Sequence, residues 1–285
     1  MNAPSVGPLG IGRIGIWRRS ADLTPALAEA AEAAGHGAAW VGGSPTDDLA
    51  GIEELLAATA RIVIAPAVVS IWANDAARLA ASYKRVTRRF GDRVLLGVGS
   101  GRRERAGAAV GRTTFSALGD FLGRLADHGV PRQRVIVGAL GPRTLRLASA
   151  QTAGAHTYLV TPRHTRTARE IVGPGALLVP EHKVCLTDDP DAARALARSE
   201  LAPYFKLGNY RASLLREGFS EADLDMASDR VLDAVVLNGD ASTVAGGLRA
   251  HFDAGADHVA VRVMDLPGQD PAATYRALAT ANLTH

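Results

Sequence analysis

Short β-branched runs alternate along this sequence with longer segments rich in Ala, Leu and Arg, whose apolar residues recur three and four positions apart. The first pattern predicts buried strands and the second predicts helices. We expect strands at residues 11–17, 38–42, 61–69, 94–99, 135–139, 157–160, 176–186 and 258–263. We expect helices between them at residues 22–34, 47–58, 75–89, 114–128, 142–153 and 164–172. This alternation is typical of βα units that build a parallel sheet.

Eight strands with intervening helices in 285 residues predict a (β/α)8 TIM barrel, an α/β fold, formed by a single domain over residues 1–285. The alternative is a doubly wound open sheet, which rarely carries eight parallel strands in one domain of this length. The connection between Leu186 and His258 is much longer than the others, and it contains the helical stretches DDPDAARALARSELAPYF and SDRVLDAVVLNG. We therefore expect a helical insertion over about residues 187–257, between the seventh and eighth strands.

Charge and composition argue against several classes of protein. The net charge is +3, and the basic residues are spread along the chain without a long run of like charge, so nucleic acid is not an expected partner. Cys185 is the single cysteine, which rules out an internal disulfide and fits a reducing compartment. The sequence shows neither a long apolar run nor a secretory signal pattern. We expect a cytoplasmic protein that does not bind membranes and that acts on a small molecule.

Two glycines and a proline follow the predicted fifth strand, in VIVGALGPRTLRLA at 135–148. Gly138 and Gly141 allow close approach to the backbone, and Pro142 suits the first position of a helix whose free N–H groups point outward. The turn could therefore hold an anion, and Arg143 and Arg146 could add positive charge. The alternative is a tight turn in which glycine is needed only for packing.

A second glycine cluster, GVGSGRRER at 97–105, follows the predicted fourth strand. Its G-x-G-x-G spacing matches neither the dinucleotide fingerprint of a Rossmann fold nor a P-loop. At the carboxyl end of a barrel strand, such a loop is well placed to contact a ligand.

The three tryptophans, Trp17, Trp40 and Trp72, lie at or just after the first three predicted strands. Indole walls there would suit a planar heteroaromatic ligand, although any of them, Trp40 especially, could instead fill the barrel interior. No spacing of histidines predicts a metal site, since His156, His164 and His182 lack an HxH or HExxH arrangement. The sequence also lacks a nucleophile motif, so we expect a bound cofactor to carry the chemistry.

Several motifs together resemble the luciferase-like monooxygenase superfamily, and more narrowly its actinobacterial branch of coenzyme F420-dependent oxidoreductases. They are GALGPRTLRLA, TYLVTPRHTRTARE, GPGALLVPEHKVCL, NYR at 209–211 followed by GFSEADL, SDRVLDAVV and AGADHVAVRV. This resemblance implies a (β/α)8 barrel that holds the deazaflavin F420 at its mouth and transfers a hydride between F420 and a small organic substrate. It also implies a homodimer.

The resemblance assigns roles to particular residues. The loop that holds the cofactor's phosphate corresponds to Ala139, Leu140, Gly141 and Pro142, with Thr161 as a further contact. A bulge with a non-prolyl cis peptide, which backs the deazaflavin ring in the family, corresponds to Ala67–Val68. The segment beside the ring and tail corresponds to Gly97, Val98, Gly99 and Ser100. We add Trp17 as a ring contact, and Asn74, Ser100, Arg102 and His182 as polar groups near the reacting centre.

The sequence departs from the family at the positions that handle protons. Some relatives carry an acidic residue and a histidine after the second strand and a glutamate in the fourth-strand loop, where this chain has Gly43, Ser44 and Ser100. Two alternatives therefore remain open at this point. One is an FMN-dependent monooxygenase on the same barrel, and the other is a noncatalytic F420-binding protein.

Overall fold

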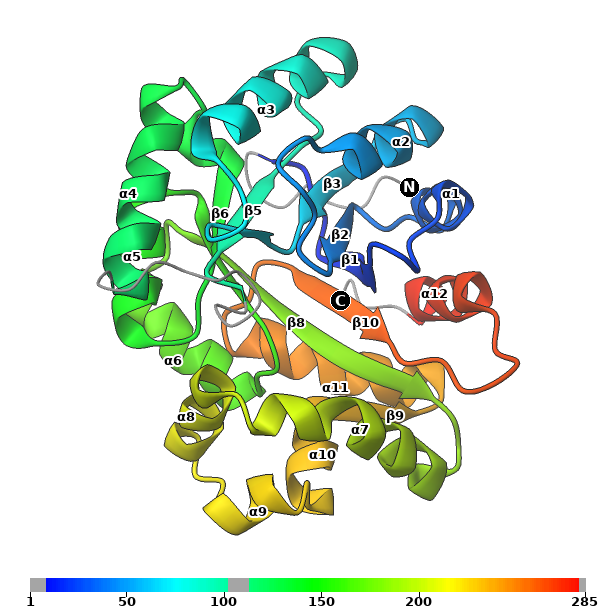
Figure 1. The fold of residues 1–285 in the computed structure, drawn as a ribbon. Coiled ribbons are helices and arrows are strands. Elements are labelled where there is room, and N and C mark those ends of the chain that lie inside the picture. The colour runs from blue at the N-terminus through cyan, green and yellow to red at the C-terminus, as the bar shows by residue number, and fades with distance from the viewer. Residues whose placement is uncertain (1–8, 102–112, 282–285) are drawn as a thin grey trace.

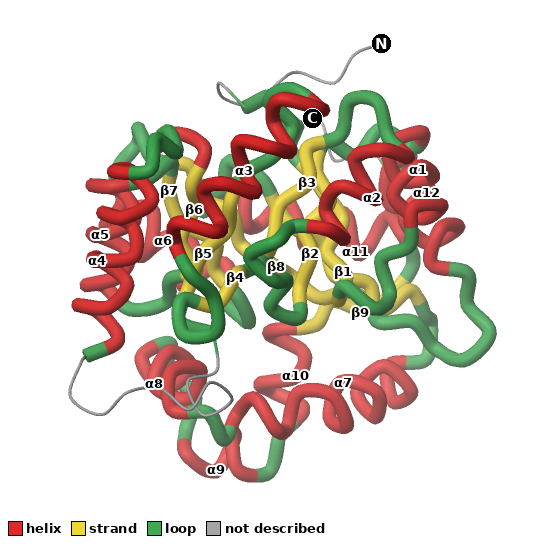
Figure 2. Tube along the Cα trace, turned by 45° about the horizontal axis from the view of Figure 1, so that its top comes forward, coloured by secondary structure: helices red, strands yellow, loops and turns green. Residues whose placement is uncertain are grey.

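The computed structural model describes residues 9–101 and 113–281 and shows a barrel of parallel strands surrounded by helices (Figure 1; Figure 2). The strands lie in the order β3-β2-β1-β10-β8-β7-β6-β5-β4, and a bridge between Ile64 and Val94 joins β3 to the chain entering β5, which closes the ring. The prediction of a (β/α)8 barrel is confirmed. The strands are β1 Ile14–Arg19, β2 Ala38–Gly42, β3 Val63–Pro66, β4 Val69–Ser70, β5 Leu96–Gly99, β6 Val135–Gly138, β7 Gly154–Thr157, β8 Leu177–Leu186, β9 Val236–Gly239 and β10 Val259–Val263.

Helices cover the outside of the barrel, and their buried faces form a continuous apolar core with the outward residues of the strands. The helices are α1 Pro25–Ala33, α2 Ala50–Ala58, α3 Ala76–Phe90, α4 Thr114–Asp127, α5 Pro142–Gln151, α6 Pro162–Val172, α7 Pro190–Phe205, α8 Gly208–Arg216, α9 Glu221–Asp225, α10 Asp229–Val235, α11 Ala241–Asp253 and α12 Pro271–Thr280. Within residues 9–101 and 113–281, none of these helices is long and apolar enough to cross a membrane.

The expected strand at 157–160 is wrong, because β7 lies earlier, at Gly154–Thr157. Gly154 has a φ of +155°, and a Cβ there would lie 1.8 Å from the carbonyl oxygen of Leu177. Only glycine satisfies that position, so β7 begins at a residue with no β-propensity of its own. The apolar run at 157–160 carries the stronger strand signal, yet it follows the strand.

The insertion differs in detail from the prediction. Helices α7 to α10 form a separate layer beside the barrel with its own core, which includes Leu201, Phe205 and Leu232 (Figure 2). The end of the expected helical stretch SDRVLDAVVLNG is a strand, since β9 pairs in parallel with the carboxyl-terminal half of β8. Helix α11 packs against β8, β9 and β10 and so belongs to the barrel wall and not to the insertion.

The lower interior of the barrel is filled by aromatic and histidine rings. Trp40 is fully buried, stacks on His156 at 4.8 Å between ring centroids, and donates a hydrogen bond from its Nε1 to Nε2 of His258 at 3.0 Å. His258 in turn donates from Nδ1 to the Gly12 carbonyl oxygen at 2.9 Å. Trp40 is therefore an interior packing residue, the alternative that its sequence position left open.

Candidate active site

The loop between β3 and β4 forms the expected bulge, and the peptide bond Ala67–Val68 in it is cis. The Val68 side chain lies against the glycines of two neighbouring strands. A Cβ on Gly99 would lie 2.8 Å from Val68 Cγ2, and a Cβ on Gly138 would lie 3.2 Å from Val68 Cγ1. A Cβ on Gly97 would lie 1.9 Å from the Pro66 carbonyl oxygen. Gly97 and Gly99 are thus required for packing against the bulge, and a side chain at Gly138 would make a tight contact with it.

Asn74 braces two loops at the mouth of the barrel. Its Nδ2 donates to the Ser70 carbonyl oxygen at 2.8 Å, and its Oδ1 accepts from the Asp47 backbone N–H at 2.9 Å. Both ends of the amide are therefore engaged by the backbone, and the role of Asn74 near the reacting centre stays a prediction. Ser100 is half-buried directly after β5, beside the bulge, whereas Arg102 lies outside the described residues.

His182 faces away from the barrel interior, so its expected place at the reacting centre is wrong. Alternate residues of β8 point inward and outward, and His182 points outward to α6 and α11. Its Nδ1 shares a hydrogen bond with His251 Nε2 at 2.9 Å, and His251 Nδ1 shares one with Thr165 Oγ1 at 2.8 Å. Burial lowers the pKa of both rings, and that of His251 to about 3, so they pack as neutral groups.

A cavity of about 130 Å³ lies between the start of α5 and one side of α6, which lines it from Arg163 to Ile171, and α8 borders it as well. Gly141 precedes α5 without a side-chain cap, and a Cβ there would meet no atom within 4 Å. Thr161 caps α6, and its hydroxyl donates to the Glu217 carboxylate. Arg163 and Arg216 also line this cavity. The predicted turn at Leu140–Pro142 and the predicted contact Thr161 are thus brought to one place.

Glu217 reaches this cavity from the end of α8. Burial raises the pKa of the Glu217 carboxyl to about 7, against the opposing effect of the Thr161 hydrogen bonds. The Leu140 carbonyl oxygen accepts a hydrogen bond from His164 Nε2 at 3.0 Å, which fixes the turn before α5. Arg143 lies over the Phe115 ring, 4.5 Å from its centroid, and is directed toward α4.

A buried ion pair fills the upper interior on the β7, β8 and β10 side of the barrel. Lys183 Nζ lies 2.8 Å from Glu181 Oε2, and both side chains are fully buried. The same ammonium lies 4.0 Å from the centroid of the Tyr158 ring. Burial lowers the pKa of Lys183 to about 8, although Glu181 acts in the opposite direction. The sequence analysis did not predict this ion pair. The feature that could have indicated it is the presence of two charged residues, Glu181 and Lys183, within the apolar run at 176–186.

The three tryptophans do not line one pocket. Trp17 is 4% exposed and packs between Tyr158, at 5.5 Å between ring centroids, and the Arg262 guanidinium. Trp40 lies one layer deeper, and Trp72 packs on the core between the strands and the outer helices. The expectation that the three indoles form the walls of one pocket is therefore wrong.

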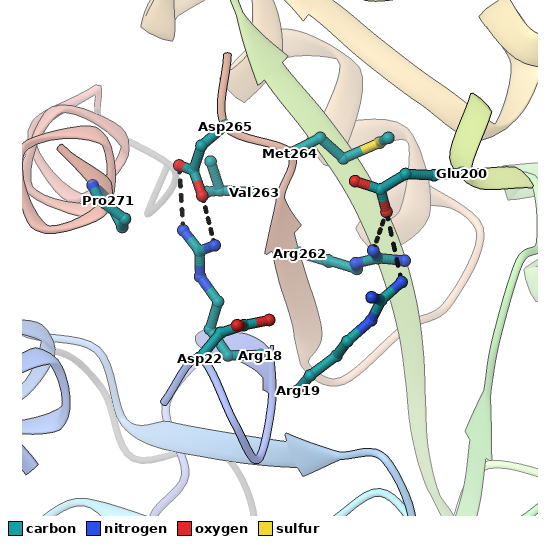
Figure 3. Close-up of a pocket in the computed structure, with 9 residues that line it drawn as sticks. All are labelled: Arg18, Arg19, Asp22, Glu200, Arg262, Val263, Met264, Asp265 and Pro271. Carbon is teal, nitrogen blue, oxygen red and sulfur yellow. Dashed lines mark hydrogen bonds and ion pairs between the residues drawn. The ribbon is translucent and has the colours of Figure 1, made fainter. Parts of the chain in front are cut away.

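A second, larger cavity of about 400 Å³ opens at the carboxyl ends of β1 and β10 (Figure 3). Arg18, Arg19 and Arg262 contribute guanidinium groups to it, and Glu200 reaches it from α7. The mouth thus carries two charged cavities, one at the helix ends of α5 and α6 and one beside the insertion.

Comparisons with solved structures find similar chains over nearly the whole length. An F420-dependent secondary alcohol dehydrogenase, in complex with an F420-acetone adduct, is 14% identical with a TM-score of 0.74, and the match covers 94% of this chain and 97% of that one. The coenzyme F420 dependent tetrahydromethanopterin reductase from Methanopyrus kandleri is 16% identical, also with a TM-score of 0.74, over the same shares of the two chains. This chain and these two enzymes share one (β/α)8 barrel fold.

An FMN-containing relative of the same fold is also similar. The oxygenating constituent of 3,6-diketocamphane monooxygenase from Pseudomonas putida, a type II Baeyer-Villiger monooxygenase in complex with FMN, is 16% identical with a TM-score of 0.71, over 95% of this chain and 97% of that one. No protein-family model and no curated sequence matches this chain.

The residues of this barrel fit a planar cofactor with an anionic tail. The cavity between α5 and α6 contains two arginines, which favour an anion, and also the Glu217 carboxyl, whose pKa burial raises to about 7. The N–H groups at the start of α5, next to this cavity, have no side-chain cap and can also bind an anion. The bulge at Ala67–Val68 is half-buried and packs on Gly97 and Gly99, which are buried. Leu140, Gly141 and Pro142 connect the two regions, so one elongated molecule could contact both.

Proposed function

We propose that this chain is a luciferase-like oxidoreductase that binds coenzyme F420 and transfers a hydride between it and a small organic substrate. The observation that carries the proposal is the cavity between the start of α5 and the side of α6, with Arg163 and Arg216 in its lining. It adjoins the turn at Leu140–Pro142, which leads from the β6 end of the mouth. An anionic tail would be held there by positive charge and by backbone donors.

Particular residues have defined tasks in this proposal. Ala67 and Val68 support the ring from below, while Gly97, Val98, Gly99 and Ser100 lie along its edge. Ala139, Leu140, Gly141 and Pro142 form the backbone turn that holds the phosphate, with Thr161 beside it. When bound, the cofactor supplies the two-electron transfer, and the protein supplies orientation and a water-poor pocket.

FMN is the second candidate, since a solved structure of this fold contains it. Both cofactors have a planar ring and a phosphate, and the same residues could hold either. They are distinguished by what the purified protein binds and by the reaction of the reduced cofactor with oxygen, which is fast for FMN and slow for F420.

The binding test is a titration with F420, FMN and NADPH, followed by tryptophan fluorescence. We expect saturable binding of F420, and we expect Gly141→Asp to raise its Kd at least tenfold, because a carboxylate at the start of α5 repels the tail phosphate. Gly175→Asp is the matched control, since Gly175 is exposed in the turn before β8 and a Cβ there also meets no atom within 4 Å. Equal affinities of the two variants for F420 would contradict the proposed cradle.

A further inference from the structure

The cavity at the carboxyl ends of β1 and β10 is distinct from the cofactor cradle and is rich in guanidinium groups. Its volume of about 400 Å³ lies within the range of small-molecule sites, about 300–1,000 Å³. Arg18 and Arg19 end β1, and Arg262 comes from β10 (Figure 3). Substrates of (β/α)8 enzymes bind at this face of the barrel, so three arginines there have a functional position.

Two of the three guanidinium groups are fixed by the surrounding protein. Arg18 makes a two-pronged interaction with Asp265 and lies over the Tyr275 ring, 5.3 Å from its centroid. Arg262 donates from Nη1 to the Tyr158 hydroxyl at 3.0 Å, and its side chain is 7% exposed. Fixed guanidinium groups recognise a planar anion at a low entropic cost, because little side-chain freedom remains to be lost.

The Glu200 carboxylate lies between the guanidinium groups of Arg19 and Arg262. It forms an ion pair with Arg262 and lies 3.6 Å from Arg19 Nη2, as the dashed lines of Figure 3 show. Arg19 is 49% exposed and is the most loosely held of the three arginines, with this long ion pair. Glu200 belongs to α7 of the insertion, and thus it places a carboxylate between two barrel arginines from a separate layer.

We infer that this cavity binds a small organic acid, whose carboxylate takes the place of Glu200 between Arg19 and Arg262. Asp22 and Asp265 also line the cavity and can accept hydrogen bonds from a hydroxyl or amino group. The ligand class is therefore a hydroxy- or amino-carboxylic acid. The role of this acid as the substrate of the oxidoreductase rests on the proposed function. The binding of the acid to the cavity does not depend on that function.

The test measures binding of malate and lactate by isothermal titration calorimetry, without any cofactor, against the uncharged malamide and lactamide. We expect the acids to bind saturably and the amides to bind at least tenfold more weakly. Arg19→Gln should weaken malate binding at least tenfold. Glu200→Gln should tighten it several-fold, because the competing carboxylate is gone.

The opposite signs of these two variants separate a binding site from a structural ion pair. Malate should also raise the Tm of the Glu200→Gln protein more than that of the unmodified protein, because it restores a partner to the buried Arg262. Arg198→Gln is the matched control, since Arg198 is 42% exposed and pairs with Asp229 at 2.6 Å within the insertion. That variant should bind malate like the unmodified protein.

The inference is overturned if acids and amides bind equally, if none of the acids binds at millimolar concentration, or if Arg19→Gln and Glu200→Gln both leave the malate affinity unchanged. The cofactor titration is a separate measurement on the same protein. Binding of malate without binding of F420 or FMN would support this site and contradict the proposed function, and the reverse outcome would contradict the acid site alone.

Discussion

Replacing Gly97 with alanine is expected to lower the free energy of unfolding by at least about 3 kcal/mol, although the change adds a single methyl group. The added Cβ would lie 1.9 Å from the Pro66 carbonyl oxygen, which belongs to the backbone of the adjoining strand. A backbone atom cannot rotate out of the way, so β3 and β5 must separate. Urea unfolding at neutral pH, followed by far-ultraviolet circular dichroism, measures the loss.

Gly119→Ala is the control for this substitution. Gly119 lies in the middle of α4, and a Cβ there would meet no atom within 4 Å. Alanine should therefore stabilise the protein by roughly 0.5–1 kcal/mol, as expected for a glycine in a helix interior. If Gly97→Ala unfolds within 1 kcal/mol of the unmodified protein, the close contact between the bulge and the glycine strand is not present in solution.

The barrel could be predicted from the sequence because its strands are marked by local composition. The run at 38–42 became β2 with the expected bounds, and 176–186 became β8 with a difference of one residue. The failures occur where tertiary packing overrides propensity. β7 begins at Gly154, because the Leu177 carbonyl leaves no room for a Cβ at that position. β9 forms because it pairs with the carboxyl-terminal half of β8.

The candidate site could be predicted only in part. Leu140 and Pro142 line one cavity with Glu217, and Thr161 donates to that carboxylate, since strand ends and helix starts fix their positions. The role of the glycines at 97 and 99 could not be read from spacing, because it depends on where Val68 and Pro66 lie in space. The arginine cavity was missed because Glu200 comes from the insertion, whose placement against the barrel leaves no local signal.

Acidification should unfold this protein well before its carboxylates are all protonated. Burial lowers the pKa of His156 and His258 to about 4 and that of His251 to about 3. The unfolded chain, with histidine pKa values near 6.5, then binds more protons than the folded protein, so stability is present above pH 6.5 and is lost as the pH falls. When the pH falls from 7 to 5, each of these rings lowers the free energy of unfolding by about 2 kcal/mol.

Glu217 acts in the opposite direction over the same range. Its pKa is raised to about 7, so the folded protein binds its proton more tightly than the unfolded chain, which stabilises the fold below pH 7 by about 2 kcal/mol at pH 5. For these four groups together the loss from pH 7 to pH 5 is about 4 kcal/mol, a large part of the total stability of a typical domain. The lowered pKa values of His36, His164 and His182 act in the same direction as those of the other histidines. Urea unfolding at both pH values measures this difference.

A variant at one buried ring identifies the source of the pH dependence. His251→Gln removes one titrating group, and we expect it to lower stability at pH 7 but to reduce the difference between pH 7 and pH 5 by about 2 kcal/mol. His128→Gln is the control, because His128 is exposed at the end of α4. The buried-histidine account fails if the unmodified protein is as stable at pH 5 as at pH 7, or if both variants keep the full difference. A smaller difference in His251→Gln alone attributes that part of the acid sensitivity to His251, because only this ring has lost its proton site.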